Sequence, residues 1–149
     1  MEKEAHTLFV YGSLMTGEYN HGHFLTDAVY IGEASILGFG LYSLGSYPGI
    51  KHTEEPYRVR GELYEVNQRD FDRICVLEGN GYMYQCEPVS AVLEDSGERI
   101  PAEVFVYLGK VYENELFSGD VQDWKEKKGF DIYRQVKYDP LDDPTYRSI

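Results

Sequence analysis

The chain has 149 residues, of which 42% are apolar and 27% charged, and its formal net charge at pH 7 is −12. This length suits one domain with a sizeable core, and the composition excludes an intrinsically disordered chain. The acidic charge argues against nucleic acid and anionic membrane surfaces as partners, because both carry phosphate groups.

Apolar runs and cysteine usage indicate the compartment. No stretch reaches the length of a membrane-spanning helix, and residues 1–6 lack the apolar core of a signal sequence. We therefore expect a cytoplasmic protein that forms a single domain over residues 1–149. The two cysteines, Cys75 and Cys86, are expected to be free thiols. Neither they nor the four histidines have the spacing of metal ligands, so we expect no metal site.

The first third of the chain predicts two strands. The β-type run at residues 6–11 ends at Gly12 and feeds a loop. A short helical turn is expected within residues 20–27. Residues 28–37 predict a second strand, with a bend or bulge at Gly32. The sequence Tyr-Pro-Gly at 47–49 is typical of a turn.

The middle of the chain predicts strands around one helix. Residues 58–66 alternate well enough for a strand, and Asn67 is a good N-cap for a helix. Residues 68–77 have the apolar spacing of an amphipathic helix, which Gly79 and Gly81 end. Residues 84–93 and 102–108 predict a hairpin that turns at 95–98. Beyond Gly109 the pattern is weaker and suggests a helix at 117–127 and a strand at 132–138.

The expected fold class is α+β. Short strands at this spacing close most easily as a small mixed β-sheet or β-barrel, here flanked by two or three short helices. Fourteen tyrosines and seven phenylalanines favour a β-rich fold as well, because aromatic side chains suit pleated strands.

One candidate site is the loop after the first strand, Tyr11-Gly12-Ser13-Leu14. A strand that enters a glycine can turn sharply and present successive main-chain N–H groups, which hold an anion or a developing oxyanion. A plain tight turn explains the same residues, and spacing alone favours that interpretation.

A second candidate is Glu78, at the end of the predicted helix. The apolar residues 74–77 precede it, so the carboxyl group is expected to be partly desolvated, with a pKa raised towards neutrality. A helix C-terminus disfavours negative charge and acts in the same direction. Such a group suits proton transfer. An ordinary surface glutamate is the alternative, which the spacing alone favours.

Five segments resemble, in order, the γ-glutamyl cyclotransferase-like family, which includes γ-glutamylamine cyclotransferase and the plant avirulence-induced proteins. They are FVYGSL at 9–14, LYSLGSYPGI at 41–50, RGELYEV at 60–66, LEG at 77–79 before MYQ at 83–85, and VFVY at 104–107. The combination is more specific than any one segment. Residues 109–149 match weakly.

The resemblance implies a small mixed β-barrel with flanking helices and a cofactor-independent reaction on a small-molecule γ-glutamyl amide. The α-amine attacks its own γ-carbonyl and yields 5-oxoproline and a free amine. Glu78 is implied as the acid/base, and the Gly12–Leu14 amides as the group that holds the glutamyl carboxylate or the oxyanion. Three aromatic residues are implied to line the pocket: Tyr84, Tyr47 and Tyr107. Core aromatics with bonded hydroxyl groups are the alternative for these three.

The chain departs from the family at two positions, and other functions stay open. Cys75 stands where the family often has Asp, and Cys86 where it often has Arg. A non-catalytic protein that binds a γ-glutamyl or similar anionic ligand is one alternative. A hydrolase that uses water on the same amide is another. The leaving amine could be an amino acid, lysine, a polyamine or a natural product.

Overall fold

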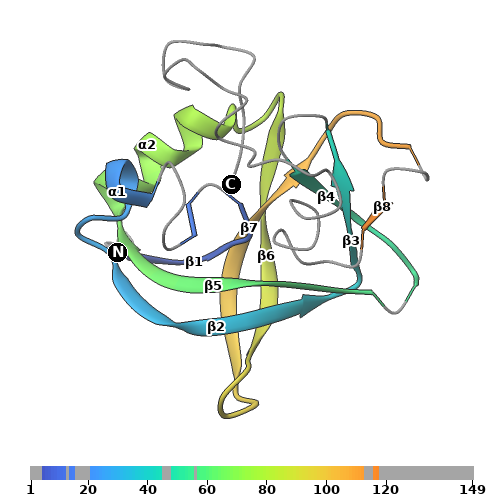
Figure 1. Cartoon of the computed structure of the whole chain (residues 1–149). Coiled ribbons are helices and arrows are strands. Elements are labelled where there is room, and N and C mark those ends of the chain that lie inside the picture. Colours follow the sequence, from blue (N-terminus) through green and yellow to red (C-terminus); the bar gives the residue numbers. More distant parts are fainter. Residues whose placement is uncertain are drawn as a thin grey trace.

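A computed structural model describes residues 5–12, 14–15, 21–44, 48–55, 57–112 and 116–117. The expected α+β class is confirmed, because this part of the chain contains eight strands and two helices (Figure 1). In chain order they are β1 (Ala5–Val10), α1 (His21–Phe24), β2 (Val29–Leu37), β3 (Phe39–Ser43), β4 (Pro48–His52), β5 (Arg58–Asn67), α2 (Gln68–Glu78), β6 (Tyr84–Leu93), β7 (Arg99–Tyr107) and β8 (Leu116–Phe117).

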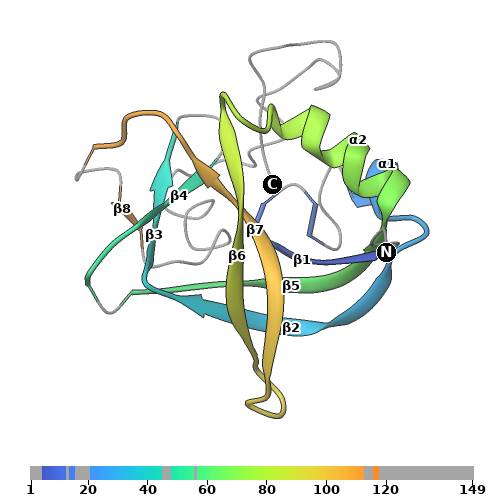
Figure 2. The same ribbon diagram turned by 180° about the vertical axis from the view of Figure 1, so that it is seen from behind.

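Five of the strands close a barrel in the order β1-β5-β2-β6-β7. Four of the five pairings are antiparallel, and a parallel contact between Leu8 of β1 and Glu103 of β7 closes the ring. Figures 1 and 2 show α1 and α2 together at one end of the barrel, with the β6–β7 hairpin projecting away from them. The small mixed barrel with flanking helices is therefore confirmed. Neither helix in the described residues is long and apolar enough to cross a membrane.

The remaining three strands form a separate sheet in the order β4-β3-β8, beside the barrel (Figure 2). The turn predicted at 47–49 is wrong for Pro48 and Gly49, which begin β4 and pair with Ser43 and Tyr42. A proline is tolerated at the first position of a strand, where the missing N–H leaves no ladder bond unmade.

The C-terminal predictions fall largely beyond the described residues. Phe117 was expected to begin a helix, but it belongs to β8 and pairs with Leu41 of β3. The rest of the predicted helix at 117–127 and the predicted strand at 132–138 lie outside the residues that the structure describes.

Local sequence signals explain the elements nearest the site. The Asn67 side chain accepts a hydrogen bond from the Asp70 N–H at 2.8 Å, so it caps α2 as predicted. Gly79 ends the helix in the left-handed conformation, with φ at 62°. The expected bulge in β2 lies between Tyr30 and Gly32, where the register with β5 shifts. The helical turn expected within 20–27 is α1.

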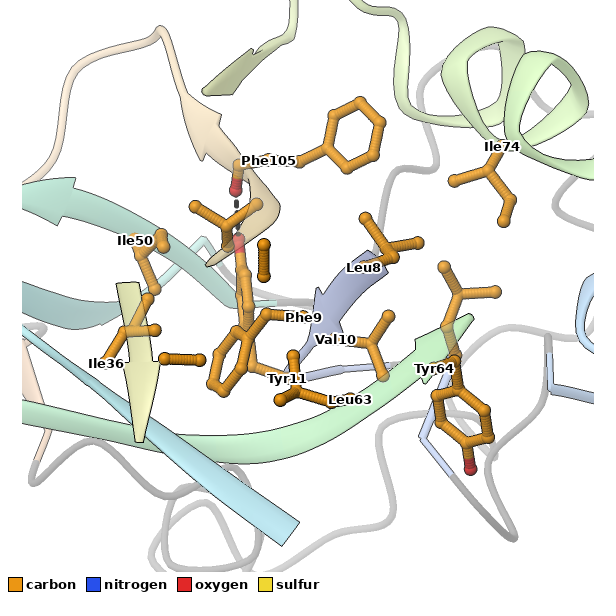
Figure 3. Close-up of a cluster of buried hydrophobic side chains, with 14 of the residues drawn as sticks. Leu8, Phe9, Val10, Tyr11, Ile36, Ile50, Leu63, Tyr64, Ile74 and Phe105 are labelled. Carbon is orange, nitrogen blue, oxygen red and sulfur yellow. Dashed lines mark hydrogen bonds between the residues drawn. The ribbon is translucent and has the colours of Figure 1, made fainter. Parts of the chain in front are cut away.

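The core fills the barrel interior and the space under α2. In Figure 3 the Tyr11 ring lies among Ile36, Ile50 and Leu63. Ile74 projects from α2 and is fully buried in the same cluster. Burial of this apolar face holds the end of α2 against the barrel.

Candidate active site

Glu78 is the last residue of α2, and its side chain is 0% exposed. The left-handed turn at Gly79 comes next and leads the chain through Gly81 to Tyr84, the first residue of β6. The partial desolvation expected from the sequence is therefore complete burial. This carboxyl group is held by a packed helix end, which fixes its direction relative to the barrel.

Tyr11 follows β1 directly, and the charge of Glu78 acts on its hydroxyl group. Its hydroxyl donates a hydrogen bond to the main-chain oxygen of Phe105 at 2.9 Å (Figure 3). Burial raises the pKa of Tyr11 most, and the negative charge of Glu78 raises it further. A main-chain hydrogen bond with Ile50 offsets part of the rise. The fold thus brings the first strand and the end of α2 to one place.

The predicted loop after Tyr11 forms a tight turn. The N–H of Met15 donates to the oxygen of Gly12 at 3.0 Å, and both Gly12 and Leu14 are buried. Ser13 lies outside the described residues. The side chain of Tyr11 belongs to the core, which fits the alternative interpretation of this residue as structural.

Two of the aromatic residues predicted to line the pocket lie together. The rings of Tyr84 and Tyr107 are 5.5 Å apart in an edge-to-face arrangement. The Tyr84 hydroxyl donates to the oxygen of Pro48 at 3.1 Å, which fits the alternative interpretation of a core tyrosine. Among the described residues, none forms a hydrogen bond with the Tyr107 hydroxyl. The predicted role of Tyr107 stays a prediction, and the predicted Tyr47 lies outside the described residues.

Strand β4, which the sequence did not predict, connects these residues. Pro48 accepts the Tyr84 hydroxyl, Ile50 contacts the Tyr11 hydroxyl through its main chain, and Lys51 reaches β7. The Nζ of Lys51 donates to the oxygen of Tyr107 at 2.9 Å and to that of Gly109 at 3.0 Å. A lysine in a five-residue strand gives no sequence signal for such a role, because its partners lie far along the chain.

Glu103 acts on both residues at which the chain departs from the resemblance. Cys75 and Cys86 are free, as expected. The Cys86 thiol donates to Glu103 Oε2 at 3.5 Å, and His6 Nδ1 lies 2.6 Å from Glu103 Oε1. Burial raises the pKa of Cys86 strongly, with the charge of Glu103 as the second cause. Burial and then the charge of Asp72 raise the pKa of Cys75 to about 11.

We expect both thiols to be unreactive in the folded protein. The thiolate is the nucleophile, so alkylation of native protein should be slow at pH 8 and should accelerate as the pH approaches about 11 for Cys75. A cysteine in the unfolded chain ionises near about 8.5, so the native state binds more protons above that pH and folding stability should fall there. Mass spectrometry after iodoacetamide treatment measures the rate.

The control for this experiment is the same treatment under denaturing, non-reducing conditions, which should modify two thiols. A count of zero with a mass lower by two hydrogens would reveal a disulfide and contradict the assignment. Fast labelling of the native protein at pH 8 would contradict the raised pKa values.

In the part of the chain that the structure describes, no three His, Cys, Asp or Glu residues are grouped as metal ligands.

The sequence matches one protein family and several known relatives. The gamma-glutamyl cyclotransferase, AIG2-like family matches residues 8–126. A candidate gamma-glutamylcyclotransferase of Methanocaldococcus jannaschii is 33% identical over 121 residues, which cover 79% of this chain and 97% of the relative. The gamma-glutamylaminecyclotransferase of Bos taurus is 31% identical over 126 residues, which cover 70% of this chain and 66% of the relative.

Solved structures show the same fold. An AIG2-like protein of Mus musculus superposes with a TM-score of 0.64 at 23% identity, over 74% of this chain and 82% of the other. An uncharacterized protein of Pyrococcus horikoshii gives a TM-score of 0.65 at 24% identity, over 89% of this chain and 98% of the other. At these identities the likeness concerns the fold alone.

Proposed function

The chain belongs to the gamma-glutamyl cyclotransferase, AIG2-like family, and we propose that it converts a γ-glutamyl amide into 5-oxoproline and a free amine. The observation that carries this proposal is the position of Glu78. Its carboxyl group is fully buried at the end of α2, and its charge acts on Tyr11 at the end of the first strand. Buried carboxyl groups of this kind are suited to proton transfer near neutral pH.

The proposed reaction is an intramolecular acyl transfer. The neutral α-amine of the glutamyl group attacks the γ-carbonyl carbon, and a carbon–nitrogen bond closes the five-membered ring. Glu78 accepts the proton that the attacking nitrogen loses. The original amide bond then breaks, and Glu78 returns the proton to the leaving nitrogen, so the carboxyl group ends in its starting state.

The turn after Tyr11 supplies the second part of the proposed site. The main-chain N–H groups of Gly12–Leu14 would bind the glutamyl carboxylate or the negative oxygen of the tetrahedral intermediate. Donors fixed in a turn need no reorganisation when charge develops. The Tyr107 side chain, half-buried beside Tyr84, would contact the same substrate.

Burial of Glu78 favours cyclisation over hydrolysis. A substrate that carries its own nucleophile gains from proximity, so the site has to fold the substrate and exclude water. A hydrolase would instead need an ordered water beside the carboxylate. No cofactor or metal enters the proposed steps.

The test is a panel of γ-glutamyl amides with different leaving amines, followed by mass spectrometry of the products. We expect 5-oxoproline and the matching amine in equal amounts from at least one member. Tight binding of a γ-glutamyl compound without any turnover would contradict the proposal and indicate a binding protein. Glutamate as the product would indicate a hydrolase.

A further inference from the structure

Lys51 carries a positive charge beside Tyr107 that the proposed chemistry does not use. Its Nζ donates to two main-chain oxygens, those of Tyr107 and Gly109, at 2.9 and 3.0 Å. It also lies 5.9 Å from the centre of the Tyr107 ring. A lysine ammonium has three donors, so these contacts leave one for another acceptor.

The partners of Lys51 do not neutralise it. Both acceptors are uncharged carbonyls, and no carboxylate of the described residues forms an ion pair with its Nζ. The chain has 26 acidic residues and only 14 lysines and arginines, so a half-buried lysine with no acidic partner in the described part of the chain is unexpected. Water screens a half-buried charge less than an exposed one, which strengthens its attraction for an anion.

The positive charge of Lys51 lies in strand β4, which contacts both Tyr84 and Tyr107. The Tyr84 hydroxyl donates to Pro48, at the start of β4, and the Tyr84 ring packs against Tyr107. Near the other end of β4, Lys51 donates to the main-chain oxygen of Tyr107. Gly49 lies between Pro48 and Lys51, and a Cβ there would come within 3.0 Å of the Tyr107 Cβ. This close approach holds β4 against Tyr107, so that Lys51 Nζ reaches the main-chain oxygen of that residue.

We propose that Lys51 is a specificity residue that binds a carboxylate on the leaving part of the substrate. The substrates are then γ-glutamyl amino acids or peptides with a free carboxylate, in preference to γ-glutamyl alkylamines. This inference rests on the proposed function, in which the Gly12–Leu14 turn binds the glutamyl end and leaves Lys51 for the other end. Such substrates carry two carboxylates and are net negative, and a chain with a net charge of −12 repels them, so a fixed cation would favour their binding.

The experiment compares γ-glutamyl-alanine with γ-glutamyl-ethylamide, which differ only in the carboxylate. The readout is the ratio of their kcat/KM values, which a general loss of activity does not change. A charged hydrogen bond contributes about 1.5–3 kcal/mol, so the parent protein should prefer γ-glutamyl-alanine by roughly 10- to 100-fold, mainly through KM. Lys51→Met should bring the ratio close to one, and Lys51→Arg should retain part of the preference.

Lys110→Met is the matched control, because it removes the same charge from an exposed lysine next to Gly109. It should leave the ratio as in the parent. An unchanged ratio in Lys51→Met would reduce Lys51 to a structural tie and overturn the inference. An equal fall in Lys110→Met would attribute the preference to long-range charge and overturn it as well.

Failure of the proposed function would look different, because the parent would release 5-oxoproline from neither compound. Calorimetric binding of the same two compounds then decides about Lys51 alone. Tighter binding of γ-glutamyl-alanine that Lys51→Met abolishes would support the inference. Equal binding of the two compounds, or no binding, would overturn it.

Discussion

Replacing Glu78 by Gln should lower the turnover rate constant on the order of 10²- to 10⁴-fold, the usual contribution of a general acid–base group. Gln has nearly the size of Glu and still forms hydrogen bonds, so the packing at the end of α2 should persist. It cannot carry the proton from the attacking nitrogen to the leaving nitrogen. The measurement is 5-oxoproline release under saturating substrate, with kcat and KM determined separately.

The control for this variant is its folding. The Glu78 side chain is 0% exposed, and keeping a charge at a buried position costs stability. The neutral Gln variant should therefore unfold at the same urea concentration as the parent or a higher one near neutral pH. Retention of most 5-oxoproline release would contradict the role of Glu78. Loss of activity through unfolding would equally remove support for it.

Replacing Gly61 by Ala should give the largest loss of stability. A Cβ at this position of β5 would lie 2.2 Å from the main-chain oxygen of Val10 and 2.7 Å from Phe9 Cζ. A main-chain oxygen in a paired strand cannot move aside without disturbing the β1–β5 ladder, in which Val10 pairs with Glu62. Overpacking typically costs 1–3 kcal/mol and occasionally more, so we expect a loss on the order of 3 kcal/mol in urea unfolding.

Gly22→Ala is the matched control for this substitution. Gly22 lies in α1, and a Cβ there would meet nothing within 4 Å. Its free energy of unfolding should stay within about 0.5 kcal/mol of the parent, as is usual for a surface change. A Gly61→Ala variant as stable as Gly22→Ala would show that β1 and β5 do not approach each other so closely.

Elements with local signals could be predicted from the sequence, and those fixed by distant contacts could not. The N-cap Asn67 and the terminating Gly79 define α2 within a few residues of chain. Strand β4 was missed because Pro48-Gly49 is typical of a turn. A Cβ at Gly49 would crowd Leu44 and also Tyr107, which lies far along the chain.

The site follows the same division. The apolar residues before Glu78 indicated that its carboxyl group was partly desolvated, but the spacing alone favoured an ordinary surface glutamate until the resemblance was considered. The partner of Tyr11 is Phe105, and those of Lys51 are Tyr107 and Gly109. The first contact depends on barrel closure, which brings β1 against β7, and the second depends on the packing of β4 against β7. No periodicity in the sequence encodes either of them.

The most direct test of the central claim is the reaction in water labelled with ¹⁸O. Cyclisation transfers the acyl group to the substrate's own nitrogen, so we expect 5-oxoproline without ¹⁸O, in equal amount to the released amine. The Glu78→Gln variant should form this product much more slowly than the parent. Hydrolysis would place one ¹⁸O atom in the γ-carboxyl group of glutamate. Labelled glutamate as the primary product would contradict cyclisation, and unlabelled 5-oxoproline formed equally well by Glu78→Gln would contradict the role of Glu78.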